Sequence, residues 1–335
     1  MRILIWHVHG SWTTAFVHGG HTYLIPTLPN RGSWGAGRPT AWNWPATAIE
    51  TPPHQLATTD IDVVILQRPH ELELTTRYTG RRPGTQLPAI YLEHNTPTGP
   101  AATTTHPMAK RPDITVVHVT EFNRLMWDCG AAPTTVIPHG IVDPGKRYTG
   151  ELDRAAVVIN EPVRRWRVTG TDLLPELSRG AGLDVFGMRL AGLTQRLATT
   201  PTPPAPGAIQ TIGDLPQHQL HHEMARRRCY LHPMRWTSLG LSLLEAMHLG
   251  MPVVALACTE VPIAVPPNAG VVTPNPHRAR QALAELITNP DRAAELGRAA
   301  RDTALAHYGL PAFLRRWDEL LARVTGESHR FREVS

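Results

Sequence analysis

One acidic side chain stands inside an apolar helical stretch of the C-terminal half. In the segment CYLHPMRWTSLGLSLLEAMHLGMPVVA (229–255), the pattern predicts a strand, a loop that reaches Gly240, and a helix over 241–249 that Gly250 ends. In such a β-α-β unit the helix N-terminus lies at the carboxyl edge of a parallel sheet. Its backbone N–H groups and dipole favour an anion there. We therefore expect a phosphate site at this helix start, with Glu245, the one carboxylate of the segment, beyond it.

Other segments carry residue types that suit ligand contacts. His94 in YLEHNTP follows a predicted buried strand, at the edge where open α/β proteins bind ligands; a capped strand end is the alternative. Gly19 and Gly20 in FVHGGH follow the first predicted strand, and glycines let backbone N–H groups approach a phosphate or sugar closely. The arginines of INEPVRRWRVTGTDLL could neutralise phosphate charge, although such clusters are commonly solvated.

The segment TSLGLSLLEAMHLGMPVV resembles the signature E-G-F-G-L-x-x-L-E-A-M-x-x-G-x-P-V-V of retaining glycosyltransferase family 4, the glycosyl transferases group 1. The match runs from Gly240 to Val254. Weaker similarities are VIPHGIV (136–142), AGVVTPN (269–275) and the closing helix, which resembles the one that crosses back onto the N-terminal domain. The resemblance implies a GT-B fold, in which two Rossmann-like doubly wound α/β domains face each other across a cleft.

The resemblance also implies roles for these residues. Glu245 occupies the position that binds the nucleotide ribose, and a carboxylate suits a vicinal diol because it can accept two O–H bonds, worth about 1.5–3 kcal/mol each. A solvent-facing glutamate is the alternative. The diphosphate would lie near Gly240 and Leu241. His94 would contact the donor sugar rather than act as a general base, and Gly19 with Gly20 would form the family's glycine loop.

Two positions depart from the family pattern. The first glutamate of the signature, a donor-sugar contact, falls on Thr237, so a hydroxyl and the backbone of Ser238 and Leu239 would have to replace it. In the R-x-x-x-x-K-G motif the arginine is Arg164, but the lysine falls on Thr169. Arg165 or Arg167 would then take the place of the lysine against the diphosphate.

The rest of the chain supplies the elements that position these residues. Apolar runs ending in polar, Pro or Gly residues predict parallel strands within 2–10, 61–67, 88–95, 114–120, 134–140, 155–160, 183–187, 229–233, 251–257 and 269–273. EFNRLMWDCG reads as a helix with an apolar face of Phe122, Leu125, Met126 and Cys129. Two helices broken at Asn289-Pro290 and a final amphipathic helix follow. Segments 26–58 and 191–212 read as long loops.

A Pro/Gly-rich junction at 142–154 divides the chain. We expect an acceptor-binding N-terminal domain over 1–145, with the helix 310–325 packing back on it, and a nucleotide-sugar-binding domain over 146–309.

Composition excludes several classes. The 335 residues have a formal charge of +5 and short basic clusters without interleaved aromatics, which does not favour nucleic acid. No apolar run suits a membrane span or a signal peptide, and three scattered cysteines suggest a cytoplasmic protein. The histidines at 7, 9, 18 and 21 lack acidic partners and the DID of 60–62 precedes its strand, so we expect no metal.

These observations predict a retaining glycosyltransferase that moves a sugar from a nucleotide-diphosphate donor to an acceptor hydroxyl, with no further cofactor. The acceptor could be a small molecule, a glycan or a lipid-linked molecule, and a lipid would imply peripheral membrane contact. A nucleotide-sugar-binding protein without transferase activity and a GT-B nucleotide-sugar epimerase are the alternatives. The oligomeric state, the base and the sugar stay open.

Overall fold

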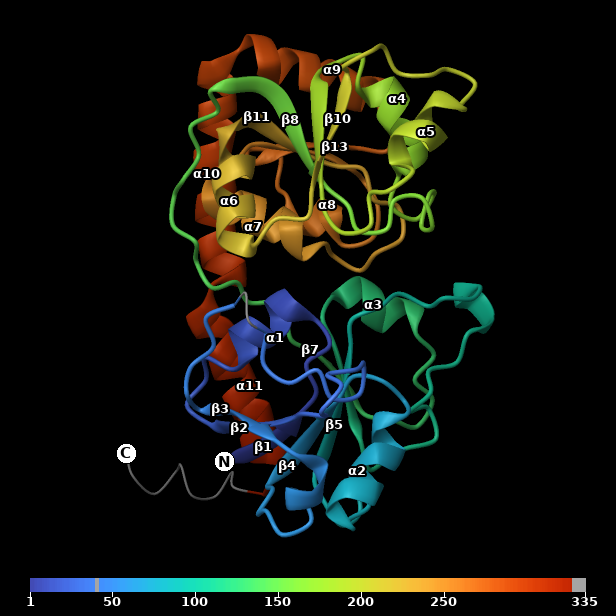
Figure 1. Cartoon of the computed structure of the whole chain (residues 1–335), viewed down its shortest axis with the longest axis vertical. Coiled ribbons are helices and arrows are strands. Elements are labelled where there is room, and N and C mark those ends of the chain that lie inside the picture. The colour runs from blue at the N-terminus through green and yellow to red at the C-terminus, as the bar shows by residue number, and fades with distance from the viewer. Residues whose placement is uncertain (40–41, 327–335) are drawn as a thin grey trace. The chain divides into compact units, whose positions relative to one another are not determined.

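The computed structural model describes residues 1–39 and 42–326. The chain forms two compact units, one of Met1–Val142 with Leu310–Ser335 and the other of Asp143–Gly309 (Figure 1). Each unit is a parallel sheet with helices on its faces, so the predicted pair of Rossmann-like α/β domains is confirmed.

The sheet of the N-terminal unit has the strand order β3-β2-β1-β4-β5-β6-β7 among the described residues, and its neighbouring strands are parallel. Its strands are β1 (Arg2–Ile5), β2 (Thr22–Pro26), β3 (Ala48–Thr51), β4 (Val63–Leu66), β5 (Ala89–Glu93), β6 (Thr115–His118) and β7 (Thr134–Val136). The helices of this unit are α1 (Gly10–Phe16), α2 (Glu71–Thr79), α3 (Glu121–Met126) and α11 (Leu310–Val324), with 3-10 turns η1 (Pro53–Gln55) and η2 (Ala101–Thr103).

The sheet of the C-terminal unit has the order β10-β9-β8-β11-β12-β13 and is also parallel. Its strands are β8 (Leu152–Val158), β9 (Gly182–Phe186), β10 (Ile209–Gly213), β11 (Arg227–His232), β12 (Val253–Leu256) and β13 (Gly270–Thr273). Its helices are η3 (Thr171–Leu173), α4 (Leu174–Leu177), α5 (Leu193–Ala198), α6 (Gln217–Arg226), α7 (Leu241–Leu249), α8 (Val261–Ala264), α9 (Pro276–Thr288) and α10 (Pro290–Tyr308).

Apolar burial explains why the predicted strands form. The side chains of β4 and β12 are buried along their whole length, as expected of parallel strands covered on both faces. The last helix, α11, belongs to the N-terminal unit because its apolar face packs there. The Trp317 ring lies 5.5 Å from that of Trp12 and 5.0 Å from that of Phe16, measured between centroids.

Three predictions about elements were wrong. The segment 26–58 is not one loop, since it contains β3, and 191–212 contains α5 and most of β10. β3 and β10 are edge strands with polar residues, so they lack the apolar runs of central strands. The α3 helix ends at Met126, and the buried residue on it is Asn123, while Leu125 is 79% exposed. The predicted apolar face therefore does not cover the core.

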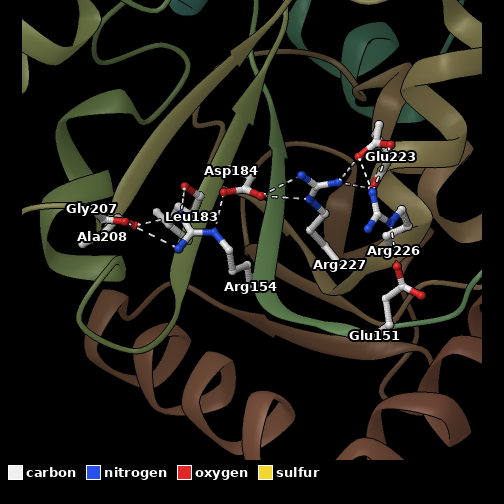
Figure 2. A network of polar contacts seen from close by, with 9 residues as sticks. All are labelled: Glu151, Arg154, Leu183, Asp184, Gly207, Ala208, Glu223, Arg226 and Arg227. Atoms are coloured by element: carbon white, nitrogen blue, oxygen red, sulfur yellow. Dashed lines mark hydrogen bonds and ion pairs between the residues drawn. The ribbon is translucent and has the colours of Figure 1, made fainter.

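A buried network of charges ties the strands of the second sheet together (Figure 2). Asp184 of β9 is 2% exposed and pairs with Arg154 of β8 and with Arg227 of β11, at 2.8 Å from the Nη2 of Arg227. Glu223 of α6 adds a second carboxylate to Arg227, at 2.6 Å. Each charge is thus paired, which burial requires.

Candidate functional site: the carboxyl edge of the second sheet

The strand order of the second sheet reverses between β8 and β11, and the loops after these two strands pair with each other. The backbone N–H groups of Arg235 and Trp236 donate to the Val168 carbonyl, at 2.9 and 3.2 Å. Gly170 has a φ of +68°, and a Cβ there would lie 1.8 Å from the Pro233 oxygen. The glycine therefore permits this contact. Ligands of doubly wound folds bind at such a reversal point.

The helix α7 begins at Leu241 and ends at Leu249, where Gly250 adopts the left-handed conformation with φ of +87°. The predicted helix is confirmed. Gly240, the N-cap, has no side chain with which to cap the helix. Its backbone packs against a ring, since a Cβ there would lie 2.5 Å from the Cε1 of His232. The start of α7 is thus a helix N-terminus at the reversal point of the sheet.

Glu245 lies one turn into α7 and is only 5% exposed. The side-chain amide of Gln217 donates to its Oε1 at 3.1 Å, and the Nε2 of His221 lies 3.4 Å from its Oε2. Both partners belong to α6, which packs on α7 in the C-terminal unit (Figure 1). A solvent-facing glutamate is therefore ruled out by the burial of this residue. The sequence pattern did not indicate Gln217 and His221 as site residues, although their spacing of four residues places them on one helix face.

His232 is a third polar residue that the sequence pattern did not indicate as part of the site. It is 1% exposed, and within the described part of the chain neither ring nitrogen has a hydrogen-bond partner. Burial lowers its pKa to about 4, so the ring is neutral at pH 7. An uncharged imidazole therefore packs beneath the N-terminus of α7.

The arginine cluster at the reversal point is divided between exposed and half-buried side chains. Arg164 is exposed and pairs with Glu161, which also pairs with Arg189 at 3.0 Å. Arg165 is half-buried, and burial together with the charge of Arg164 lowers its pKa. Arg167 is exposed and lies 3.4 Å from Asp172.

The threonines that replace the family's lysine and glutamate differ in burial. Thr169 is fully buried; its hydroxyl donates to the Arg165 carbonyl and lies 2.9 Å from that of Thr171. It therefore cannot take the place of a lysine that reaches a phosphate. Thr237 is half-buried with its hydroxyl 3.6 Å from the sulfur of Met234, whereas Ser238 and Leu239 are buried.

The N-terminal unit has its own reversal point, between β1 and β4, and His94 lies beside it. Its Nε2 is 3.2 Å from the Oε1 of Gln67, the residue that follows β4. The Gln67 amide nitrogen donates to the Trp6 carbonyl at 2.8 Å, so its oxygen faces the histidine. The ring of His94 is also 3.9 Å from that of His9.

The histidines at this edge are neutral. Burial, and then the neighbouring imidazoles of His9 and His139, lower the pKa of His94 well below its usual value. Burial is also the main cause that lowers the pKa of His9 to about 4 and that of His139 to about 3. Within residues 1–39 and 42–326, no three His, Cys, Asp or Glu side chains are arranged to hold a metal. The cluster therefore offers neutral imidazoles rather than charges.

Gly19 and Gly20 do not lie with His94, so their predicted role beside the sugar was wrong. The helix α1 intervenes after β1 and returns the chain to the amino edge of the sheet, where the Thr22 N–H donates to the Met1 carbonyl at 3.0 Å. A Cβ at Gly19 would lie 2.3 Å from the Tyr23 hydroxyl. Gly19 therefore serves packing at the opposite edge, whereas a Cβ at Gly20 would meet nothing within 4 Å. The loop that does follow β1 carries His7 and His9, and Gly10 begins α1.

Comparison with known proteins agrees with this geometry. A model of the family described as "Glycosyl transferases group 1" matches residues 205–303, which include α6 and α7. No curated protein matches the sequence significantly.

No helix in the described part of the chain has the length and apolar character that a membrane span requires.

Solved structures share the fold over nearly the whole chain. Sucrose-phosphate synthase from Thermosynechococcus elongatus has a TM-score of 0.71 at 14% identity, covering 98% of this chain and 100% of that one. HepE of Anabaena in complex with UDP has 0.65 at 14%, covering 96% and 100%. AviGT4, a glycosyltransferase of avilamycin A biosynthesis, has 0.59 at 16%, covering 98% and 99%. The chain therefore has the predicted GT-B fold class.

Proposed function

We propose that this chain is a retaining glycosyltransferase that moves a sugar from a nucleotide-diphosphate donor to an acceptor hydroxyl. The observation that carries the proposal is the buried carboxylate of Glu245, one turn beyond the N-terminus of α7 at the reversal point of the second sheet. The glycosyltransferase family match over 205–303 supports it. HepE, which shares the fold, binds UDP and UDP-glucose.

In the proposed site, different residues of the C-terminal unit bind different parts of the donor. Glu245 accepts hydrogen bonds from the ribose hydroxyls. The backbone N–H groups at Gly240 and Leu241 bind the diphosphate, and Arg164 and Arg165 oppose its charge. A cation and a helix N-terminus stabilise the charge that grows on the leaving diphosphate, so this proposal needs no metal and no cofactor.

The donor sugar is proposed to contact the Thr237 hydroxyl and the backbone of Ser238 and Leu239. On the N-terminal unit, proposed to bind the acceptor, His94 is a sugar contact. Because its imidazole is neutral, it serves by hydrogen bonding rather than by charge. The departing phosphate takes the proton of the acceptor hydroxyl, which leaves no protein general base to be assigned.

A binding protein without transfer is the second candidate, because the buried Thr169 cannot supply the charge of the family's lysine. A thermal-shift titration with UDP, GDP and ADP comes first. A ligand that binds the folded state raises its stability by RT ln(1 + [L]/Kd), so one nucleotide should raise the Tm of the wild type far more than that of Glu245→Ala. No shift with any of the three would remove the nucleotide site.

Sugar release separates the two candidates. The UDP-sugar, GDP-sugar or ADP-sugar matching the active nucleotide is incubated with the protein, and nucleoside diphosphate formation is followed. Turnover supports the transferase. Binding without any turnover, with a panel of sugar and lipid acceptors present, supports the binding protein.

A further inference from the structure

Two side chains of α6 hold the carboxylate to which the ribose contact is assigned. Gln217 and His221 lie four residues apart on this ten-residue helix, and both face Glu245. Gln217 donates a hydrogen bond to Oε1, whereas the Nε2 of His221 lies 3.4 Å from Oε2 and makes no hydrogen bond within the described part of the chain, so its ring limits the side chain of Glu245 by contact. The glutamate is therefore held from one side by groups that belong to the protein.

A carboxylate held in this way can still bind a ligand. Each of its oxygens has two lone-pair directions, so a bond from Gln217 leaves room for a hydroxyl donor on the same atom. A free glutamate on a helix has several side-chain rotamers, and ordering it on binding costs conformational entropy. Contacts that order it beforehand remove that cost from the binding step.

We infer that Gln217 and His221 are positioning residues that orient Glu245 for the two ribose hydroxyls and so set the preference for ribose over deoxyribose. The inference rests on the proposed function, because it assigns Glu245 to the ribose. It adds α6 to the nucleotide site. Neither residue need touch the nucleotide itself.

The test compares affinities for UDP, ADP and GDP with those for their 2′-deoxy forms, by calorimetry. The ratio of the two dissociation constants isolates the hydroxyl contact. Removing a hydrogen bond to a charged group costs about 1.5–3 kcal/mol, so we expect the wild type to prefer the ribonucleotide by roughly 10-fold or more. Glu245→Gln should bring the ratio close to one.

Gln217→Ala should lower the ratio at least 3-fold while the affinity for the deoxynucleotide changes little, because the base and phosphate contacts remain. His221→Ala should act in the same direction because it removes the ring beside Oε2, and His221→Gln, which keeps a side chain there and supplies an N–H donor, should recover part of the ratio. Gln219→Ala and His222→Phe are matched controls, since both residues are exposed on the same helix. Their ratios should equal that of the wild type.

The outcomes distinguish two failures. A wild-type ratio of one, or no binding at all, would remove the ribose assignment and this inference with it. A large wild-type ratio that falls in Glu245→Gln but is unchanged in both Gln217→Ala and His221→Ala would overturn the inference and leave the proposed function standing. A variant that still binds, but whose two affinities fall together at an unchanged ratio, would also overturn the inference, because orientation of Glu245 acts on the ribose contact alone.

Discussion

The side chain of Gln67 fixes which nitrogen of His94 carries hydrogen. Its amide nitrogen is committed to the Trp6 carbonyl, so its oxygen must accept from the Nε2 of His94. Neutral His94 therefore has its proton on Nε2, and Nδ1 is the acceptor nitrogen. Gln67, which follows β4, thus determines which ring nitrogen is protonated in His94, which follows β5.

Gln67→Glu should raise the pKa of His94. A carboxylate in place of the amide favours the imidazolium by its charge. Ring resonances of His94 followed by NMR as a function of pH would measure the change, and the pH profile of sugar transfer should shift with them. Gln55→Glu, at an exposed glutamine of the same unit, is the control and should leave both curves in place. Superimposable titration curves for Gln67→Glu and wild type would mean that the side chain at position 67 does not lie against the His94 ring.

Stability should fall as the pH is lowered from about 6.5 towards 4. His139 has a folded-state pKa of about 3 and His9 one of about 4, both below the unfolded value of about 6.5. Between these values the unfolded chain binds protons that the folded chain does not. Each such histidine therefore costs roughly 1.4 kcal/mol per pH unit over that range.

His139→Phe should make the dependence on pH shallower, whatever its effect on stability at pH 7. Denaturant unfolding at several pH values measures the slope. His54→Phe changes an exposed histidine and should keep the wild-type slope. An unchanged slope in His139→Phe would mean that His139 is not neutral in the folded protein near pH 5.

Central strands and α7 could be predicted because burial on both faces leaves a continuous apolar run, and because Gly250 ends the helix with a left-handed residue. The edge strands β3 and β10 could not be predicted. The residues of β10, for example, are exposed or half-buried and partly polar, so its sequence resembles that of a loop. Contacts between distant segments were equally hidden. Neither the Gln67–His94 bond nor the Gln217–Glu245 bond has a local pattern, as their partners are 27 and 28 residues apart.

Gly19 and Gly20 show how a motif can mislead. The glycine pair comes soon after β1 in sequence, but seven residues of helix lie between them and carry the chain back along the sheet. Residue order alone does not say at which edge a loop lies. A helix predicted at α1 would have placed His7, His9 and Gly10, rather than Gly19 and Gly20, at the ligand-binding edge of the sheet.

Asp184→Asn should destabilise the C-terminal unit by about 3–5 kcal/mol. The substitution removes the buried carboxylate that Arg154 and Arg227 share, and it leaves Arg227 with Glu223 alone as its charged partner (Figure 2). Chemical denaturation measures the loss. Glu151→Gln breaks the pair with Arg226, whose members are 51% and 36% exposed, and should cost less than about 1 kcal/mol. Similar losses in the two variants would mean that the network contributes no more than surface pairs do.

Gly170→Ala should weaken nucleotide binding as well as stability. The added Cβ would clash with the Pro233 oxygen, so the loops after β8 and β11 must separate. Alanine would also have to adopt the φ of +68° that Gly170 has, which is strained for a residue with a Cβ. Gly192→Ala is the matched control: it has a similar φ of +77° but nothing within 4 Å of the new atom. The control should lose about 1 kcal/mol of stability from strain alone and keep its nucleotide affinity. The clash joins one residue of each loop, so it must change how the loops after β8 and β11 pair. Equal nucleotide affinities in Gly170→Ala and wild type would therefore show that this pairing does not shape the nucleotide site.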